Sequence, residues 1–286
     1  MNNTPLKENH AFQASKIFKA SAQSIYKHSP KTQYEYNLLP TPPIGWELEI
    51  EGWGYPNVSE VISNSPFVYS FVTEDGSLKD MGAELVTKGG LTDRYLFASL
   101  LEIGWINENL LTGFKFSHRC SFHIHMDVRD WTVGNLKTFI ALFILTEPLL
   151  QTLCEDHRKG NSYCTPLNQL NLQQSQLHQY SWNDSKYWAL SLNRLNDLGT
   201  VEIRMHHGSA NIDSLQQWIK TFQQMWHFCS STKFQDFQKL IKSFNTYHDV
   251  QKLCTQIFDP VVTNNLEHIS REIKDSLFNT QFFLEN

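Results

Sequence analysis

The sequence predicts an α+β fold, and two patterns support this prediction. Three stretches alternate between apolar and polar side chains, as half-buried strands do: residues 45–51, 120–128 and 200–206. Two other stretches, residues 133–156 and the segment after Asp213, carry apolar side chains at a helical spacing of about 3.6 residues. A chain of 286 residues with 41% hydrophobic content can bury a substantial core in one domain or two.

The strand predicted at residues 45–51 has an unusual charge on one face. Three apolar residues alternate with three glutamates: Trp46, Leu48, Ile50 and Glu47, Glu49, Glu51. Carboxylates two residues apart on one face lie about 7 Å from each other and repel. A cation should therefore lie over this face, either salt from solvent at a surface strand or a bound metal ion. This strand alone leaves both interpretations open.

Turn-forming and helix-capping residues predict the elements on either side of the strand at 45–51. Residues 1–43 are polar and end in a proline cluster, which predicts an N-terminal extension that is partly flexible. Extended runs at 66–72 and 83–88 predict two strands, and Asp75-Gly76 predicts a turn after the first of them. Thr92 is expected to cap the helix that follows.

Two later strands repeat the design of the first. On 120–128 the polar face carries His123, His125 and Asp127. On 200–206 it carries Thr200, Glu202, Arg204 and His206, and Glu84 could join from the strand at 83–88. An ordinary solvated face uses threonine, lysine, serine and glutamine freely. Because these faces are dominated by ligand-type residues, the strands together favour a binding site.

The remaining segments are predicted to be mostly helical. The helix at 133–156 contains Pro148, which is expected to bend it. The polar segment 157–185 predicts a mobile loop over the site that selects substrates. A strand is expected at 187–194, Asp213 is expected to cap a helix, and the residues from 231 to 286 are expected to be helical.

A carboxylate-rich site with few imidazoles and no obvious thiolate suits Mg²⁺ or Mn²⁺. His123-x-His125 by itself also fits zinc, as in a hydrolase. Magnesium usually arrives with phosphates, which makes a nucleotide the expected partner. Arg204 could then neutralise charge on a transferring phosphoryl group, although an ion pair with a neighbouring glutamate explains it equally well.

Composition excludes several other classes of protein. A net charge of −5 and a pI of about 6.2 argue against a nucleic-acid or membrane-surface binder. The five cysteines form no Cys-x-x-Cys pair, which fits a reducing compartment. The apolar run at 139–145 is too short to span a bilayer, and no P-loop motif is present. A cytoplasmic protein is expected.

A series of short motifs runs in order over residues 44–230. They are Gly45-Trp-Glu-Leu-Glu49, Asp75-Gly-Ser-Leu78, Gly82-Ala-Glu-Leu-Val86, Cys120-Ser-Phe-His-Ile-His-Met-Asp127, Arg158 with Asn161-Ser-Tyr-Cys164, Leu192-Asn193, Thr200-Val-Glu-Ile-Arg204, and His207-Gly-Ser209 followed by Trp218. The ordered series resembles the amidoligase family, a branch of the carboxylate–amine ligases. Ser121 departs from this pattern, because the family usually has glycine after the cysteine.

The resemblance implies a glutamine-synthetase-like fold, in which a curved antiparallel sheet has helices packed on its convex face. It implies ATP and Mg²⁺ or Mn²⁺, with more than one ion, on the concave face. The activity it implies is a ligase that phosphorylates a carboxylate and lets an amine attack the acyl phosphate. Residues 44–230 would form the catalytic domain. Residues 231–286 lie outside the resemblance and are expected, as a helical segment, to pack on the same domain.

The same resemblance assigns roles to residues. Metal-binding positions are Glu47, Glu49, Glu84, His123, His125 and Glu202. Catalytic positions are Arg204, Glu202, Glu49 and Asp75. Nucleotide- or substrate-binding positions are Arg158, Asn193, Lys88 and His207. The base that takes a proton from the amine is left open between Asp75, a loop residue and the substrate phosphate.

Two alternatives stand beside the ligase. One is a metal-dependent hydrolase or amidase that uses His123, His125 and Glu202. The other is an inactive relative that binds nucleotide. The identities of the small-molecule or peptide carboxylate and amine, and the oligomeric state, are left open.

Overall fold

The computed structural model describes residues 41–52, 67–79, 82–110, 114–170, 186–195 and 197–285. The predictions for residues 1–40, and for the outer part of the polar loop at 171–185, lie outside these described residues.

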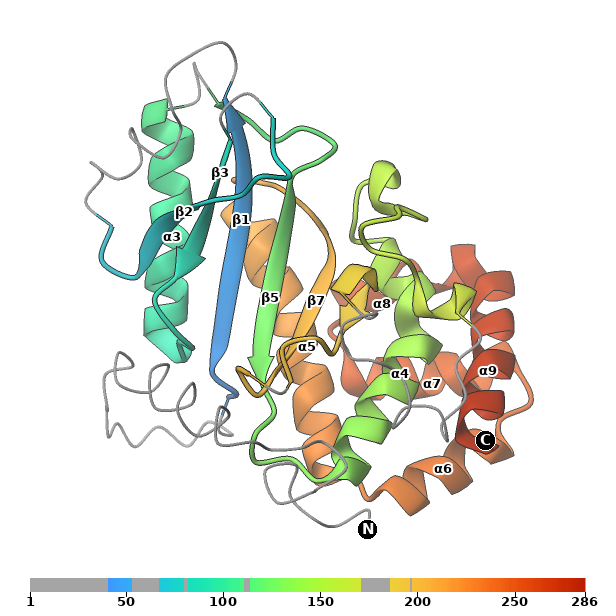
Figure 1. The fold of residues 1–286 in the computed structure, drawn as a ribbon. Coiled ribbons are helices and arrows are strands. Elements are labelled where there is room, and N and C mark those ends of the chain that lie inside the picture. The colour runs from blue at the N-terminus through green and yellow to red at the C-terminus, as the bar shows by residue number, and fades with distance from the viewer. Residues whose placement is uncertain are drawn as a thin grey trace.

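Within the described ranges, one antiparallel sheet forms the centre of the fold (Figure 1). Its strands are β1 (Ile44–Gly52), β2 (Ser70–Glu74), β3 (Ala83–Thr87), β4 (Phe114–Lys115), β5 (Ser121–Asp127), β6 (Leu190–Ser191) and β7 (Thr200–His207). The spatial order is β2-β3-β1-β5-β7-β6, and β4 pairs with the end of β1. The α+β class and the antiparallel sheet are confirmed.

Helices pack on the sheet and beside it (Figure 1). They are α3 (Asp93–Leu110), α4 (Val133–Gln151), α5 (Ile212–Ser231), α6 (Phe234–Ser243), α7 (Tyr247–Ile257), α8 (Pro260–Thr263) and α9 (Ser270–Glu285), with short 3₁₀ turns η3 (Asp156–Arg158), η4 (Leu167–Gln169) and η7 (Leu266–Ile269). Helices α3 and α5 lie along one face of the sheet, and α4 gathers with α6 to α9 at one side of it (Figure 1). Buried residues of both groups belong to one hydrophobic core.

The apolar face of β1 explains which side the helices cover. Trp46, Leu48 and Ile50 are completely buried. The Trp46 indole Nε1 donates to Ser99 Oγ of α3 at 2.8 Å, so the buried polar atom of the tryptophan is satisfied. Since side chains alternate along a strand, the glutamates of β1 face the opposite side of the sheet, away from α3.

Several predicted boundaries differ from the structure. Helix α4 ends at Gln151, because Thr152 and Leu153 close a tighter turn with N–H bonds to the carbonyls of Leu149 and Leu150. Asp213 lies in the first turn of α5, and the cap is Asn211, whose side chain accepts from Ser214 N.

Two predicted strands are displaced or shortened. The strand expected at 66–72 forms at Ser70–Glu74 instead. The strand expected at 187–194 is reduced to Leu190–Ser191. The shortening has a physical cause, because the residues before β6 pair with a loop: Thr165 N donates to Tyr187 O, and Ala189 N donates to Thr165 O, both at 2.8 Å.

Helix α4 is the one helix among the described residues that is long and apolar enough to cross a membrane. Of its most apolar window, 83% is buried inside the protein. Helix α4 is therefore a core helix, packed chiefly against α9, α5 and α6.

Candidate active site

The polar side chains of β1, β3, β5 and β7 meet on the sheet face that α3 does not cover. Strand register brings them together: Glu47 lies opposite His123, Glu49 opposite Glu84, and His125 opposite Glu202. Directly opposed residues of antiparallel strands share a face. The alternation of each strand and the pairing between strands thus gather residues from distant parts of the sequence.

A β-bulge in the β5–β7 pair changes one of the predicted faces. The register shifts between Phe122 and Ile124, so His206 pairs opposite Phe122 on the core side. There the His206 ring packs 5.1 Å from the ring of Trp218, and burial lowers its pKa to about 3. The prediction that His206 shares a face with Glu202 is therefore wrong. His207, opposite Ser121, takes the polar face instead.

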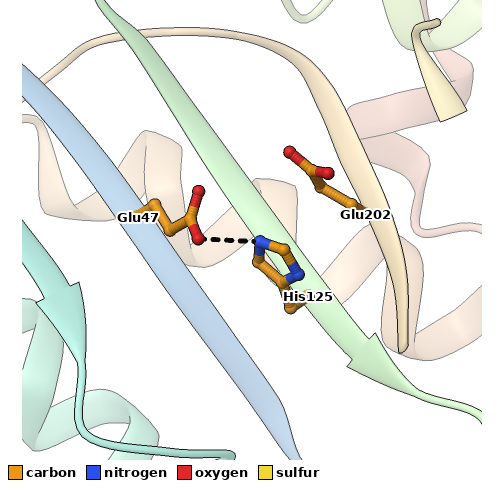
Figure 2. A group of neighbouring side chains, drawn as sticks. All are labelled: Glu47, His125 and Glu202. Atoms are coloured by element: carbon orange, nitrogen blue, oxygen red, sulfur yellow. Dashed lines mark ion pairs between the residues drawn. The ribbon is translucent and has the colours of Figure 1, made fainter. Parts of the chain in front are cut away.

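Three adjacent strands contribute the group shown in Figure 2: Glu47, His125 and Glu202. His125 Nε2 lies 3.0 Å from Glu47 Oε1. Burial opposes ionisation of Glu47, but His125 and His123 outweigh it and hold the pKa of this carboxyl well below its ordinary value. Burial likewise opposes a charge on His125, and the carboxylates of Glu47 and Glu202 nevertheless raise the pKa of His125.

His123 lies between the carboxylates of two strands. Its Nδ1 is 3.4 Å from Glu47 Oε2 and 3.6 Å from Glu202 Oε1. Its other nitrogen, Nε2, is 2.6 Å from Ser121 Oγ. The ring is 2% exposed, so these side chains, rather than water, form its surroundings.

The carboxylates of Glu49, Asp75 and Glu84 form a second group at the other side of Glu47. Burial, followed by the charges of Glu47, Glu49 and Asp75, raises the pKa of Glu84 to about 9. A cation beside these acids would favour the ionised form of Glu84.

The donor atoms fit divalent metal ions. Three groups each offer three ligand atoms within 4.8 Å of one another: Glu47, His125 and Glu202; Glu47, Glu84 and His123; and Glu49, Asp75 and Glu84. Carboxylate oxygens with an occasional imidazole are ligands that Mg²⁺ and Mn²⁺ accept. All the residues predicted to bind metal belong to these groups.

Two arginines take different positions around Glu202. Arg204 Nη1 donates to Glu202 Oε1, so the guanidinium lies beside the metal-ligand groups. Arg158 is buried and donates to the carbonyl oxygens of Arg204 at 2.6 Å and Met205 at 3.2 Å. Arg158 therefore contacts the backbone of the bulge rather than the carboxylates.

The other predicted binding residues, Lys88, His207 and Asn193, have hydrogen-bond partners outside the carboxylate groups. Lys88 follows β3 and its Nζ donates to Val68 O at 2.8 Å. His207 Nδ1 accepts from Glu155 N at 3.3 Å. Asn193 lies in the turn after β6, where its backbone N–H donates to Ser191 Oγ at 3.3 Å. Among the described residues, no contact between Lys88, His207 and Asn193 is seen, so they do not form one binding group.

A cavity of about 370 Å³ adjoins the Glu47–His125 pair at the end of the sheet where β1 begins. Its apolar lining includes Phe71, Val86 and Leu198, and its charged lining includes Lys88, Asp127 and Arg129. Gly45 leaves this end of the sheet open, since a Cβ there would lie 3.1 Å from Thr87 Oγ1. Phe71 and Arg129 were not predicted. Asp127 was placed on this face with His123 and His125, but no role was assigned to it.

A comparison with known protein families found a match that includes two strands of the site, β5 and β7. Residues 106–226 match the model of a family described as "Putative amidoligase enzyme". The match contains β5, β7 and the residues on them, while β1 and β3 precede it. The resemblance to this family is confirmed for the motifs within residues 106–226, and the motifs at 45–49, 75–78 and 82–86 lie before the match. A search of curated proteins gave no match to the sequence.

Proposed function

We propose that the protein is an ATP- and Mg²⁺-dependent carboxylate–amine ligase. It would join the two substrates through an amide bond formed by way of an acyl phosphate. The match of residues 106–226 to an amidoligase family supports this proposal. The observation that carries the proposal is the crowding of Glu47, Glu49, Glu84 and Glu202 on one sheet face with two histidines. This much acid in one place is suited to holding cations that in turn hold phosphates.

Two metal positions are proposed. Glu47, His125, Glu202 and His123 would hold one ion, and Glu49 and Glu84 would hold another, with Asp75 beside them. When bound, Mg²⁺ or Mn²⁺ would offset the negative charge of the nucleotide phosphates and of the transferring phosphoryl group. A hydrolase based on zinc is less well supported, because the three groups together contain five carboxylates and only two histidines.

The protein's own residues supply the remaining chemistry. A carboxylate does not condense with an amine in water because its oxide is a poor leaving group, and phosphorylation corrects this. Arg204, held beside Glu202, is proposed to bind the phosphoryl oxygens as their charge increases. Asp75 is half-exposed at the edge of the second group, and we propose that it takes the proton from the attacking amine.

We assign the nucleoside to the cavity beside Gly45. Phe71, Val86 and Leu198 offer an apolar surface of the kind that purine bases contact, and the phosphates would extend toward Glu47 and His125. Lys88 at the cavity wall would favour an anionic ligand, whereas the charge of Arg129 is paired with Asp127. All five cysteines are free and buried, in keeping with the proposed cytoplasmic location.

The test is turnover with ATP, Mg²⁺ and pools of amino acids, polyamines and peptides. Phosphate release that requires both an acid and an amine, with a product lighter by one water than its two substrates, is expected. Turnover without nucleotide, with zinc in the purified protein, would contradict the ligase and support a hydrolase. Nucleotide binding without turnover across broad pools would contradict it in favour of an inactive relative.

A further inference from the structure

Ser121, the first residue of β5, lies between the two proposed metal positions. Its Oγ is 2.5 Å from Glu49 Oε2, which belongs to one position, and 2.6 Å from His123 Nε2, which belongs to the other. The residue is 3% exposed. We infer that Ser121 is a positioning residue that links the two metal positions and fixes the tautomer of His123. The inference rests on the proposed metal sites and not on the ligase reaction.

The backbone first fixes where the hydroxyl can lie. Ser121 N donates to Glu49 Oε2 at 2.7 Å, the same oxygen that the hydroxyl contacts. Two contacts to one carboxylate oxygen hold the Glu49 side chain against the start of β5. Because Ser121 and His123 are two residues apart on a strand, their side chains share the polar face of the sheet.

The hydroxyl has one proton to donate, which limits the possible arrangements. If it donates to Glu49, its lone pairs remain for His123, and the ring must carry its proton on Nε2. If it donates to His123 instead, an oxygen lone pair faces the Glu49 carboxylate at 2.5 Å and repels it. The first arrangement satisfies all three groups at once.

This arrangement has a consequence at the far side of the ring. With the proton on Nε2, Nδ1 presents a lone pair toward Glu47 and Glu202, at 3.4 and 3.6 Å. A lone pair facing two carboxylates is repelled by them unless a cation lies between the three groups. Ser121 thereby prepares His123 to bind metal through Nδ1, as hydrogen-bond partners of ligand histidines commonly do.

Mn²⁺ binding to the full chain, measured by calorimetry and by electron paramagnetic resonance, tests the inference without any turnover. Removing a hydrogen-bond partner of a metal ligand typically weakens affinity by about 10- to 100-fold, and we expect this for Ser121→Ala and Ser121→Gly. The matched control is Ser99→Ala. Ser99 is equally buried, but its Oγ contacts Trp46 and Leu96 on the core side, so Mn²⁺ affinity should not change.

A second measurement needs no variant. Long-range ¹H–¹⁵N spectra of the wild-type protein saturated with Mg²⁺, a diamagnetic ion, report which nitrogen of His123 carries the proton. We expect the proton on Nε2 and an Nδ1 ¹⁵N shift typical of a metal-bound nitrogen. An Nδ1–H tautomer, or Mn²⁺ affinity within twofold of wild type in a folded Ser121→Ala protein, would overturn the inference. Loss of ligase activity alone would not bear on it.

Discussion

Glu147 and Glu84 are two carboxylates that the fold shields from water, but their surroundings are opposite. Hydrogen-bond donors surround Glu147, and other acids surround Glu84. Glu147, on α4, is 1% exposed and accepts from Leu167 N at 2.7 Å and Asn168 N at 2.8 Å. The Asn168 side-chain Nδ2 donates to it as well, at 2.9 Å. Glu84, on β3, has as its strongest electrostatic neighbours Glu47, Glu49 and Asp75.

The two carboxyls differ in how their neighbours affect the pKa. Burial raises the pKa of Glu147 to about 7, while its N–H donors act in the opposite direction. Burial raises the pKa of Glu84 to about 9, and the neighbouring acids add to the effect. The first carboxylate is satisfied by the protein and anchors a turn. We propose that the second binds a cation, so that Glu147 is a structural acid and Glu84 a metal ligand.

The largest effect is expected where charge develops in the reaction. Arg204→Ala and Glu49→Gln should each reduce ligase turnover by about 10²- to 10³-fold or more, because each removes charge directed at the phosphoryl group or its metal. Steady-state assays measure this, with circular dichroism as the check on folding. Turnover within a few-fold of wild type in either folded variant would remove that residue from the site.

Glu147→Gln should affect stability rather than metal binding. The glutamine NH₂ group would replace one carboxylate oxygen and face N–H donors that then have no acceptor. We expect the free energy of unfolding to fall by about 1–3 kcal/mol. Chemical denaturation measures the change. An unchanged denaturation midpoint would mean that the three N–H contacts are not stabilising. A change in the Mg²⁺ dependence of turnover would mean that Glu147, like Glu84, affects metal binding.

Arg158→Lys should lower turnover by roughly tenfold while leaving the protein folded. Arg158 reaches the carbonyls of both Arg204 and Met205 through a planar fork, and a lysine cannot reproduce this geometry. The comparison is with Arg194→Lys, an exposed arginine paired with Asp197. Equal activity in both variants would show that the bulge needs no support from Arg158.

The pH dependence of stability should distinguish Glu84 in the metal-free protein. Its pKa is raised from 4.5 to about 9, so the folded state favours the protonated acid. The contribution of Glu84 to the free energy of unfolding should therefore be full below pH 4.5 and be lost as the pH rises toward 9. His125 and Glu147, whose pKa values are also raised, change in the same direction, so wild type must be compared with Glu84→Gln.

Glu84→Gln should flatten this dependence, and thermal unfolding in a chelator across that pH range measures it. Addition of Mg²⁺ should reduce the decline in wild type, because the ionised Glu84 then has a cation. A wild-type profile that rises over the same range would contradict the crowding of acids on this face.

The sequence was a good guide to the site where alternation is unbroken. The period of two on β1 and β5 correctly placed Glu47, Glu49, His123 and His125 on one face. It failed on β7 at His206, because a bulge adds one residue and no local residue pattern marks it. The contact of Arg158 with the bulge was equally invisible, since it depends on tertiary pairing across the chain.

Other differences arise from competition between good local signals. Asn211 and Asp213 are both capping residue types, and only the backbone path after β7 decides between them. Ser121 was seen only as a departure from glycine. Its role depends on the distance to Glu49, which lies in a strand 72 residues away. Whether the sheet has the glutamine-synthetase-like arrangement stays a prediction.

Mn²⁺ titration of the metal-free full chain tests the central claim most directly, with wild type, Glu47→Gln and Glu147→Gln measured side by side. The account predicts that wild type binds at least two ions, that Glu47→Gln loses most of the affinity, and that Glu147→Gln retains it. Absence of Mn²⁺ binding in wild type, or equal binding in all three proteins, would contradict the claim that the carboxylates on the sheet form a metal centre.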